Sequence, residues 1–420
     1  MDTMVYWIWL SLCCSPSGST FGKLIKELNG ARAIYEADSK RISSIVGYRN
    51  SDRTALENKS LDRAQEIYDF CRKHKVGLLC YEDSRYPKAL REIDNPPVLL
   101  YYRGVLPDFD NIFAISAVGT RALSDYGRRN AFRISYDLAT AGATVVSGMA
   151  RGIDGVAMAG AIAAGGRTVA IIGSGIDICY PPEHLRLARE IVKNGCVMTE
   201  FAPGTPANKF NFPKRNRIIS GISAATVVFE GPERSGALIT ARCAKEQGRS
   251  VYALPGNVGS KNSQLSNLLL KSGAKICTSA DDILNDFNDK YCKFINPFLL
   301  KERVAVDMMS TLSEYGVSAV CQNDDIFEVP RRRRPAEKVV DSFDVKDAYV
   351  DAEEPKSPPA DFDKRALKIY KKIPLSDSCS IESLVDDEIS LREVMKCLLK
   401  LEMSGFVQLL PGETVSRKTN

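Results

Sequence analysis

The sequence has few of the residues from which catalytic and metal centres are usually built. Among its 420 residues only His74 and His184 are histidines, and no two of the twelve cysteines are spaced as a CxxC pair. Structural zinc sites and disulfide frameworks need such clusters, so we expect reduced, scattered thiols in a cytoplasmic protein without metal or cofactor. Acyl or phosphoryl transfer needs a histidine base, a metal or paired carboxylates. We therefore predict a protein that is not an enzyme.

Long apolar runs are also missing. The stretch MVYWIWLSLCC near the start has only eleven residues, whereas a helix needs about 20 to span a bilayer. Asp2 stands where a secretory signal has basic residues, and no cleavage site is obvious. We expect this stretch to be the first buried helix of a domain, and we expect no membrane segment.

Composition and length predict a globular protein with several domains. Hydrophobic residues make up 44% and charged residues 26%, and the net charge of +5 permits an anionic partner without requiring one. The length exceeds a single core of about 100–200 residues. We divide the chain into an N-terminal helical domain of SAM/HhH type (1–108), a Rossmann-like domain (109–290), a flexible charged linker (291–361) and a winged-helix-like domain (362–420).

The linker is poor in large apolar residues. Its stretch VPRRRRPAEKVVDSFDVKDAYVDAEEPKSPPAD is rich in charge and proline, which is typical of a disordered tether. The arginines at 331–334 could touch nucleic acid electrostatically, or could be solvated and balanced by the acids beyond them.

The tail after the linker has the pattern of three helices and a β-hairpin, as in a winged helix. Its would-be recognition helix mixes Arg392, Lys396 and Lys400 with Glu393 and Glu402. A DNA-reading helix is usually more basic, so we expect a protein contact there.

Between 111 and 287 short apolar runs alternate with helical stretches. The runs are IFAISAV, ATVVSG, RTVAIIG, CVMTE, ATVVFEG and SVYALPG, and the run VLLYY precedes them. Runs rich in Val and Ile without polar alternation suit strands buried on both faces. We therefore predict the fold class α/β, with an extended Rossmann-like, doubly wound and mostly parallel sheet. Five of the six runs lead into Gly, Ser or Pro, at the carboxyl ends where such folds bind ligands.

These strand ends lack the GxGxxG pattern of a dinucleotide site. They suit anion capture instead, because small residues let backbone N–H groups approach a phosphate. Arg121, Arg151 and Ser235 follow strand ends and could complete such a site. Alternatively, the glycines only make tight turns, and Asp154 and Glu230 are only caps or turn residues.

A segment without acids follows the fourth of these strands. From 201 to 229 there is no Asp or Glu, while FNFPKRNR (210–217) combines two phenylalanines with three cations, and Lys209 precedes it. A patch of one sign attracts polyanions, and interleaved aromatics can stack bases. Either of Phe210 and Phe212 could instead be a core residue, and the cations could belong to a solvated turn.

Three successive leucines near the end of the α/β region make more than one face of a helix apolar. We predict that Leu268 and Leu270 contact a second copy in a homodimer. Burial within the monomer is the alternative.

Several motifs in succession resemble the DprA/Smf family of DNA-processing proteins of bacterial natural transformation. They are GTRALSDYG, VVSGMARGIDGVA, TVAIIGSGIDICYPPEH, TEFAPGTPANKFNFPKRNRIISGIS and SGALITARCAKEQGRSVYALPGN. The resemblance is dense from 99 to 284 and looser on both sides. It implies an extended Rossmann fold that binds single-stranded DNA, self-associates and helps to load the RecA recombinase, without hydrolytic activity.

Transferred residue by residue, the resemblance implies a DNA-binding site that contains Arg121, Ser147, Gly148, Arg151, Gly152, Phe212, Lys214, Arg215, Asn216 and Arg217. The charge and strand-end arguments add Lys209, Phe210 and Ser235 to this predicted site.

Three positions depart from the family pattern. Met158 stands where histidine is usual, His184 where asparagine is usual, and Leu265 where glycine is usual. The first two put in doubt any nucleotide chemistry that used those side chains, and the third would alter the turn before LLLKSGA.

The sequence therefore favours a non-enzymatic cytoplasmic protein that binds single-stranded DNA and helps to load RecA during transformation. One alternative is a Rossmann-type enzyme or sensor of a free nucleotide-derived ligand at the same strand ends. A small ligand does not need four cations and two aromatics, whereas a strand of several nucleotides does. Another alternative is an interaction scaffold that acts through its two end domains.

Overall fold

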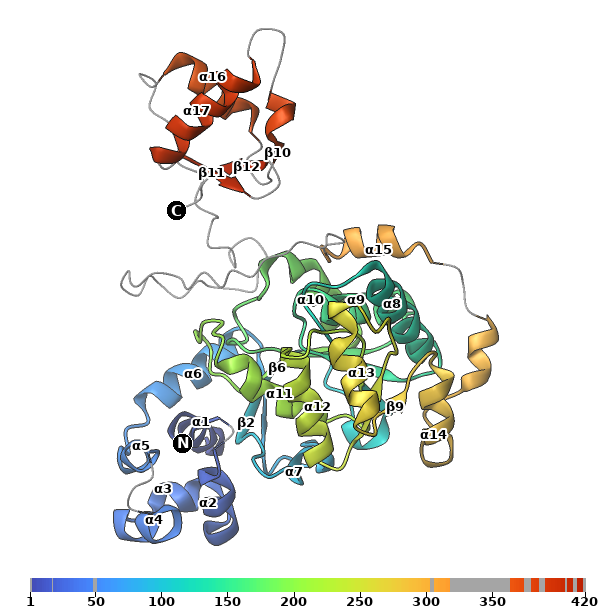
Figure 1. Ribbon diagram of the computed structural model, residues 1–420. Helices are drawn as coiled ribbons and strands as arrows, with labels where there is room; N and C mark the ends of the chain where they lie inside the picture. Colours follow the sequence, from blue (N-terminus) through green and yellow to red (C-terminus); the bar gives the residue numbers. More distant parts are fainter. Residues whose placement is uncertain are drawn as a thin grey trace. The chain divides into compact units, whose positions relative to one another are not determined.

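The structure of the protein is a computed structural model. It describes residues 2–16, 18–47, 51–302, 306–317, 363–373, 379–384, 390–404, 406–410 and 414–417. The chain forms two compact units, one within 1–348 and one within 349–420, and both are drawn in Figure 1. The predicted linker lies almost wholly outside the described residues.

Short helices begin the larger unit. The first, α1 (Thr3–Cys13), starts at Asp2, whose carboxylate accepts a hydrogen bond from the Met4 N–H at 2.9 Å. Trp7, Ile8 and Leu10 of this helix are buried, so the apolar opening stretch is a core helix, as predicted. The helices that follow are α2 (Thr20–Leu28), α3 (Ala31–Glu36), α4 (Ser39–Val46), α5 (Arg53–Glu57) and α6 (Asp62–Lys73). None of the helices in the described ranges is both long enough and apolar enough to cross a membrane.

A sheet of nine described strands forms the centre of the larger unit. Its order is β1-β2-β6-β5-β4-β3-β7-β8-β9. The bounds are β1 (Gly77–Cys80), β2 (Leu99–Gly104), β3 (Ala114–Val118), β4 (Thr144–Ser147), β5 (Thr168–Ile171), β6 (Cys196–Thr199), β7 (Ala225–Val228), β8 (Ser250–Ala253) and β9 (Lys275–Ile276). Pairs from β6 to β9 in this order are parallel, whereas β2 is antiparallel to both β1 and β6.

Helices cover both faces of the sheet because the parallel strands need crossover connections. They are α7 (Lys88–Arg91), α8 (Asp125–Thr140), α9 (Ile153–Ala163), α10 (Leu185–Asn194), α11 (Asn211–Gly221), α12 (Gly236–Glu246), α13 (Gln264–Lys271), α14 (Asp281–Tyr291) and α15 (Met308–Glu314), with the 3-10 turns η1 (Phe109–Asn111), η2 (Pro182–His184), η3 (Lys261–Ser263) and η4 (Pro297–Glu302).

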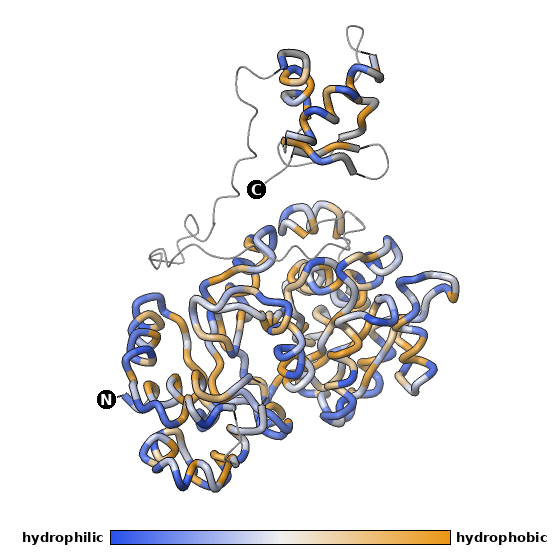
Figure 2. The backbone as a smooth tube through the Cα atoms, turned by 60° about the vertical axis from the view of Figure 1, so that its left-hand side comes forward, coloured by the Kyte–Doolittle hydropathy of each residue, from blue (hydrophilic) through white to orange (hydrophobic). Residues whose placement is uncertain are grey.

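Alternate side chains of each strand point to opposite layers. In β3, Ile115 and Ala117 pack with α8, α9 and α10, whereas Ala114 and Val118 pack with α11 and α12. The strands are therefore apolar on both faces, and hydrophobic segments gather inside the unit in Figure 2.

The smaller unit holds α16 (Lys364–Lys372), η5 (Ile381–Leu384) and α17 (Leu391–Met403) beside a sheet of order β10-β12-β11. The strands are β10 (Cys379–Ser380), β11 (Val407–Leu410) and β12 (Thr414–Arg417), and β11 and β12 pair antiparallel. Its core includes Ile369, Val394 and Leu398. The winged-helix assignment of this region stays a prediction.

The predicted mostly parallel α/β sheet is confirmed, and every predicted apolar run forms a strand. The sequence analysis missed β1 and β9. Because β1 and β2 are part of this sheet, the sheet already begins at Gly77, inside the range that the sequence assigns to the helical domain.

Candidate nucleic-acid interface

The candidate site lies at the carboxyl edge of the parallel strands. The strand order reverses at β3, which pairs with β4 on one side and β7 on the other, and ligands of doubly wound folds bind outside such a reversal. The Thr120 N–H donates to the Glu230 carbonyl at 2.8 Å, which joins the loops after β3 and β7. The Glu230 carboxylate accepts from the Ser124 N–H at 2.9 Å. Glu230 therefore holds the start of α8 in place. This agrees with the alternative from the sequence, in which Glu230 is a cap or turn residue.

The loops after β3 and β4 pack directly against each other. The Ile153 N–H donates to the Thr120 carbonyl at 3.1 Å. Gly152 has a φ of 78°, and a Cβ there would lie 2.3 Å from the Thr120 oxygen, so this position needs glycine. Arg121 and Arg151 are both exposed, and they project from two loops that are joined at their bases.

Ser147 and Gly148 are buried beneath these loops. The Ser147 hydroxyl donates to the Ala117 carbonyl at 2.6 Å, and the Gly148 N–H donates to the Asp154 carboxylate at 3.1 Å. Both polar groups are used inside the protein. The structure thus places these two predicted site residues under the site, where they support it.

Arg215 occupies an interior position in α11, and its predicted contact with DNA stays a prediction. It is only 4% exposed, and its guanidinium donates to the Gly148 carbonyl at 2.8 Å and to the Ile171 carbonyl. Burial lowers the pKa of Arg215 to about 10, so the side chain is still charged at neutral pH. Burial also raises the pKa of Asp154, against the attraction of Arg215. Arg215 therefore fastens α11 to the ends of β4 and β5.

Arg217 is buried as well, and an acid outside the acid-free segment neutralises it. Its guanidinium makes a two-pronged ion pair with Glu200, with N–O distances of 2.8 and 2.7 Å, and its Nε donates to the Asn95 carbonyl at 2.9 Å. Asn216 is also buried. Arg217 therefore anchors α11 to the end of β6 and to the segment before β2. The Asn216 amide donates instead to the Gly236 carbonyl at 3.4 Å, at the start of α12.

The exposed part of the motif lies at the start of α11. Phe210 is 65% exposed, and the Lys209 ammonium lies 5.3 Å from its ring centroid. Lys209 is exposed and Lys214 is half-buried. These three side chains match the predicted combination of cations with an aromatic surface.

Phe212 is half-buried and sits among charged and aromatic neighbours. The Arg121 guanidinium lies 5.3 Å and that of Arg215 5.9 Å from its ring centroid, and the Tyr180 ring is 5.7 Å away. Cation–π attraction of this kind favours one orientation of an arginine. Phe212 thus connects the start of α11 to Arg121 on the loop after β3.

Sequence reasoning missed Tyr180 and Glu200 as members of this site. Tyr180 was part of the quoted motif YPPEH, and its ring faces Phe212 from the connection between β5 and α10. Glu200 directly precedes the acid-free segment, and its position at the end of β6 was the available signal for its pairing with Arg217.

Three predicted residues lie apart from this group of contacts. Ser235 caps α12, since its hydroxyl accepts from the Ala237 N–H at 3.3 Å. Leu268 and Leu270 lie on α13, where Leu268 is 38% exposed and Leu270 is half-buried. Neither leucine is fully buried in the monomer, so the homodimer contact stays a prediction.

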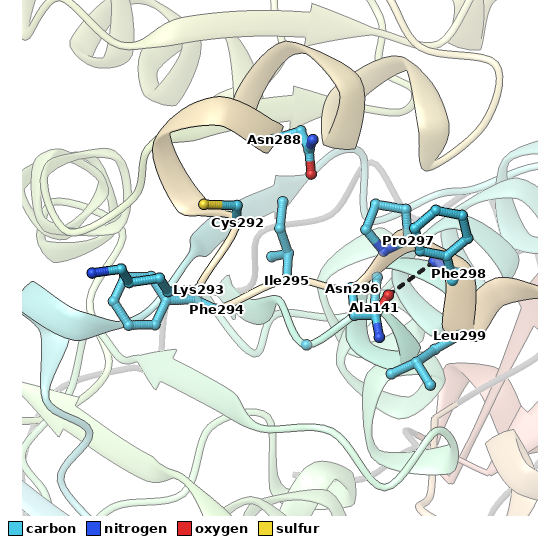
Figure 3. A pocket seen from close by; sticks show the side chains of 11 residues that line it. Ala141, Asn288, Cys292, Lys293, Phe294, Ile295, Asn296, Pro297, Phe298 and Leu299 are labelled. Atoms are coloured by element: carbon cyan, nitrogen blue, oxygen red, sulfur yellow. Dashed lines mark hydrogen bonds between the residues drawn. The ribbon is translucent and has the colours of Figure 1, made fainter.

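A hollow of about 480 Å³ lies elsewhere on the larger unit. Figure 3 shows that residues from α14 to η4 line it, including Cys292, Phe294 and Phe298. Ala141 and Gly142 complete the lining. Because Ala141 precedes β4, this hollow is at the amino edge of the sheet, opposite the loops described above.

The fold and the loops together define a class, a doubly wound α/β protein with an exposed cationic and aromatic edge. The chain also matches the family model of the DNA recombination-mediator protein A over residues 77–288, about half of its length. The chain belongs to this family.

Curated relatives and a solved structure agree with this assignment. The chain is 37% identical over 269 residues to protein Smf of Escherichia coli, which covers 60% of this chain and 72% of the relative. It is 36% identical over 272 residues to the DNA processing protein DprA of Streptococcus pneumoniae, which covers 64% of this chain and 95% of the relative. The X-ray structure of DprA from Streptococcus pneumoniae is similar with a TM-score of 0.59 and 33% identity, over 68% of this chain and 99% of that chain.

Proposed function

We propose that the protein binds single-stranded DNA at the carboxyl edge of its parallel sheet and acts by binding, without catalysis. The observation that carries this proposal is the pairing of the exposed Phe210 ring with the Lys209 ammonium, at the start of α11. Bases of a single strand are free to stack on such a ring, whereas those of a duplex are already stacked on one another. Membership of a family named for recombination mediation supports a DNA partner.

The cations that we propose as phosphate contacts are those with exposed or half-exposed side chains. They are Arg121, Arg151, Lys209 and Lys214. Arg215 and Arg217 contribute indirectly, because they hold α11 and thereby fix the position of Phe210. Ser147, Gly148, Gly152 and Asn216 likewise shape the loops and the helix that carry the exposed groups.

The arrangement favours a strand over a free nucleotide-derived ligand. The proposed contacts come from the loops after β3, β4 and β6, so they extend along the sheet edge. Contacts that run across several strand ends suit a chain of phosphates better than one or two phosphates.

The wider role that we propose is DNA processing in natural transformation, with loading of the RecA recombinase on the bound strand, by a cytoplasmic homodimer. The family's description as a recombination mediator supports a recombinase partner. Partly exposed leucines on α13 support self-association. We further propose that 1–108 and 362–420 act as separate helical and winged-helix-like domains joined to the sheet domain, the latter by the charged linker.

Fluorescence anisotropy with labelled single-stranded and duplex oligonucleotides across a salt series tests the binding proposal. Affinity for the single strand should exceed that for duplex, and its logarithm should fall with log salt by about 0.7 per phosphate contact. Arg121→Ala and Lys209→Ala should each weaken binding and reduce that slope. The matched control is Lys193→Ala, because Lys193 pairs with Glu190 near the end of α10, at the amino edge of the sheet. A flat salt response, or equal affinity for duplex, would contradict the proposal.

A further inference from the structure

The connection between β5 and α10 touches the candidate site at three successive points. Residues 180–184 (YPPEH) supply the Tyr180 ring beside Phe212, the Glu183 carboxylate beside Arg151, and the His184 ring beside the Met149 carbonyl. Its partners belong to two other segments, the start of α11 and the loop between β4 and α9.

Glu183 accepts a hydrogen bond from the Nε of Arg151. The two side chains are 34% and 58% exposed, respectively, so the pair lies at the surface of the site. Burial would raise the pKa of Glu183, but its hydrogen bond from Arg151 opposes this and the pKa is lowered overall. Glu183 is therefore a carboxylate at neutral pH.

The backbone on both sides of this ion pair is fixed. Met149 and Gly152 have φ values of 52° and 78°, and the Gly155 N–H donates to the Ala150 carbonyl at 3.1 Å. On the other side, a Cβ on Gly316 would lie 2.3 Å from the Glu183 carbonyl oxygen. Both side chains therefore start from closely packed backbone, and the ion pair restricts their remaining rotamers.

His184 anchors the connection from inside. It is 1% exposed, and its Nδ1 lies 3.0 Å from the Met149 carbonyl oxygen. A carbonyl can only accept, so Nδ1 carries the proton and donates it to this bond. The same bond fixes the loop that carries Arg151.

We propose that Glu183 is a positioning residue that holds the Arg151 guanidinium ready for a phosphate of the bound strand. A free arginine loses much rotamer freedom when it binds a ligand, and a guanidinium that is already oriented loses less. This inference rests on the proposed DNA binding. It predicts coupling between the two residues, since Glu183 acts only through Arg151.

A double-mutant cycle tests the coupling. Affinity for a labelled single strand is measured for the wild type, Arg151→Ala, Glu183→Gln and the double variant, with folding checked by thermal melting. Arg151→Ala should weaken binding about fivefold in the wild type but less than about twofold in the Glu183→Gln background, a coupling expected for contacting charges. Glu190→Gln is the matched control, because it removes an acid that pairs with Lys193 instead and should leave the effect of Arg151→Ala unchanged.

The sign of the coupling shows whether Glu183 positions Arg151 for a phosphate or competes with the phosphate for it. A larger effect of Arg151→Ala in the Glu183→Gln background would show that the carboxylate competes with phosphate, and would overturn the inference. Equal effects in the two backgrounds would overturn it as well. If Arg151→Ala has no effect while Arg121→Ala weakens binding, the inference fails and the proposed function stands. If neither change weakens binding, both fail.

Discussion

At the scale of single residues, the two phenylalanines of the FNFPKRNR motif have different surroundings. Phe210 is 65% exposed, whereas Phe212 is half-buried against Tyr180 and two guanidinium groups. An exposed ring can offer a face to a base, whereas the contacts of a half-buried ring order its neighbours. We therefore propose that Phe210 stacks on a base and that Phe212 supports Arg121.

Phe210→Leu should weaken binding of single-stranded DNA by at most about 1–3 kcal/mol, because leucine keeps the apolar bulk but lacks the aromatic face. The salt slope and the melting temperature should change little, since no cation and no core contact is lost. Anisotropy titrations and thermal melts check these quantities on one preparation. Phe212→Leu is the matched comparison and should lower the melting temperature. A Phe210→Leu variant with wild-type affinity would remove this ring from the site.

The buried ion pair between Arg217 and Glu200 predicts a stability effect. Their side chains are 9% and 6% exposed. Glu200→Gln would leave the Arg217 charge buried and uncompensated, which should lower the free energy of unfolding by about 3–5 kcal/mol.

Urea unfolding measures this change in stability. Glu190→Gln breaks an ion pair with a more exposed lysine and should have little effect on the same measurement. Similar stability of the two variants would show that the buried pair contributes no more than a surface pair.

The sequence located the motif but could not separate its exposed cations from its buried ones. It showed Lys209, Lys214, Arg215 and Arg217 as one acid-free group. Which of them face solvent depends on how α11 packs against β5 and β6, and on the partner Glu200, and neither is visible in a local count of charges.

At the scale of elements, the strands were predictable wherever an apolar run was long enough. Runs such as ATVVSG became buried parallel strands because they are apolar on both faces. Two strands escaped notice. The strand β1 has only four residues and begins soon after the end of α6, and β9 consists only of Lys275 and Ile276, both exposed. Both exist through pairing with a neighbouring strand, which local pattern does not record.

The connection between β5 and α10 predicts a dependence of stability on pH. Burial lowers the pKa of His184 from its ordinary 6.5, against its hydrogen bond to the Met149 carbonyl, and the charges of Glu183 and Arg151 act on it in opposite directions. The unfolded chain therefore binds a proton at this residue at a higher pH than the folded one. Stability from His184 is present above the unfolded pKa and is lost as pH falls below about 6.5 toward the lowered value.

His184→Asn removes this titration while its amide can still donate to the Met149 carbonyl. Urea midpoints measured between about pH 7.5 and 5 should fall more steeply for the wild type than for this variant. Parallel pH profiles of the two proteins would show that His184 is not the group responsible.

At the scale of the whole molecule, composition predicts the order of the domains, and the domain boundaries stay predictions. The sheet, however, begins before the predicted boundary at 108, because β1 and β2 pair into it. Parallel strands must be joined by crossover connections, but this rule does not require antiparallel strands at the edge of the sheet. The sequence therefore offered no reason to include β1.

The last strand in the sheet order, β9, bears on self-association. An edge strand presents unpaired backbone groups that invite contact with another chain unless they are covered. Near this edge, Ile276 is 59% exposed and Leu268 of α13 is 38% exposed. Leu269, the next residue of α13, packs against the core instead. A substitution at Leu268 can therefore alter the surface while the core stays intact.

Leu268→Glu should therefore convert the proposed homodimer into a monomer, because a carboxylate placed in an apolar contact would be desolvated without a partner. Light scattering across a concentration series measures the mass, and thermal melting confirms that the variant is folded. Val258→Glu is the matched control, because Val258 is 94% exposed in a loop after β8 and should leave the mass unchanged. A folded Leu268→Glu variant that keeps the mass of a dimer would exclude this side chain from the contact, and a wild type with the mass of a monomer would contradict the homodimer itself.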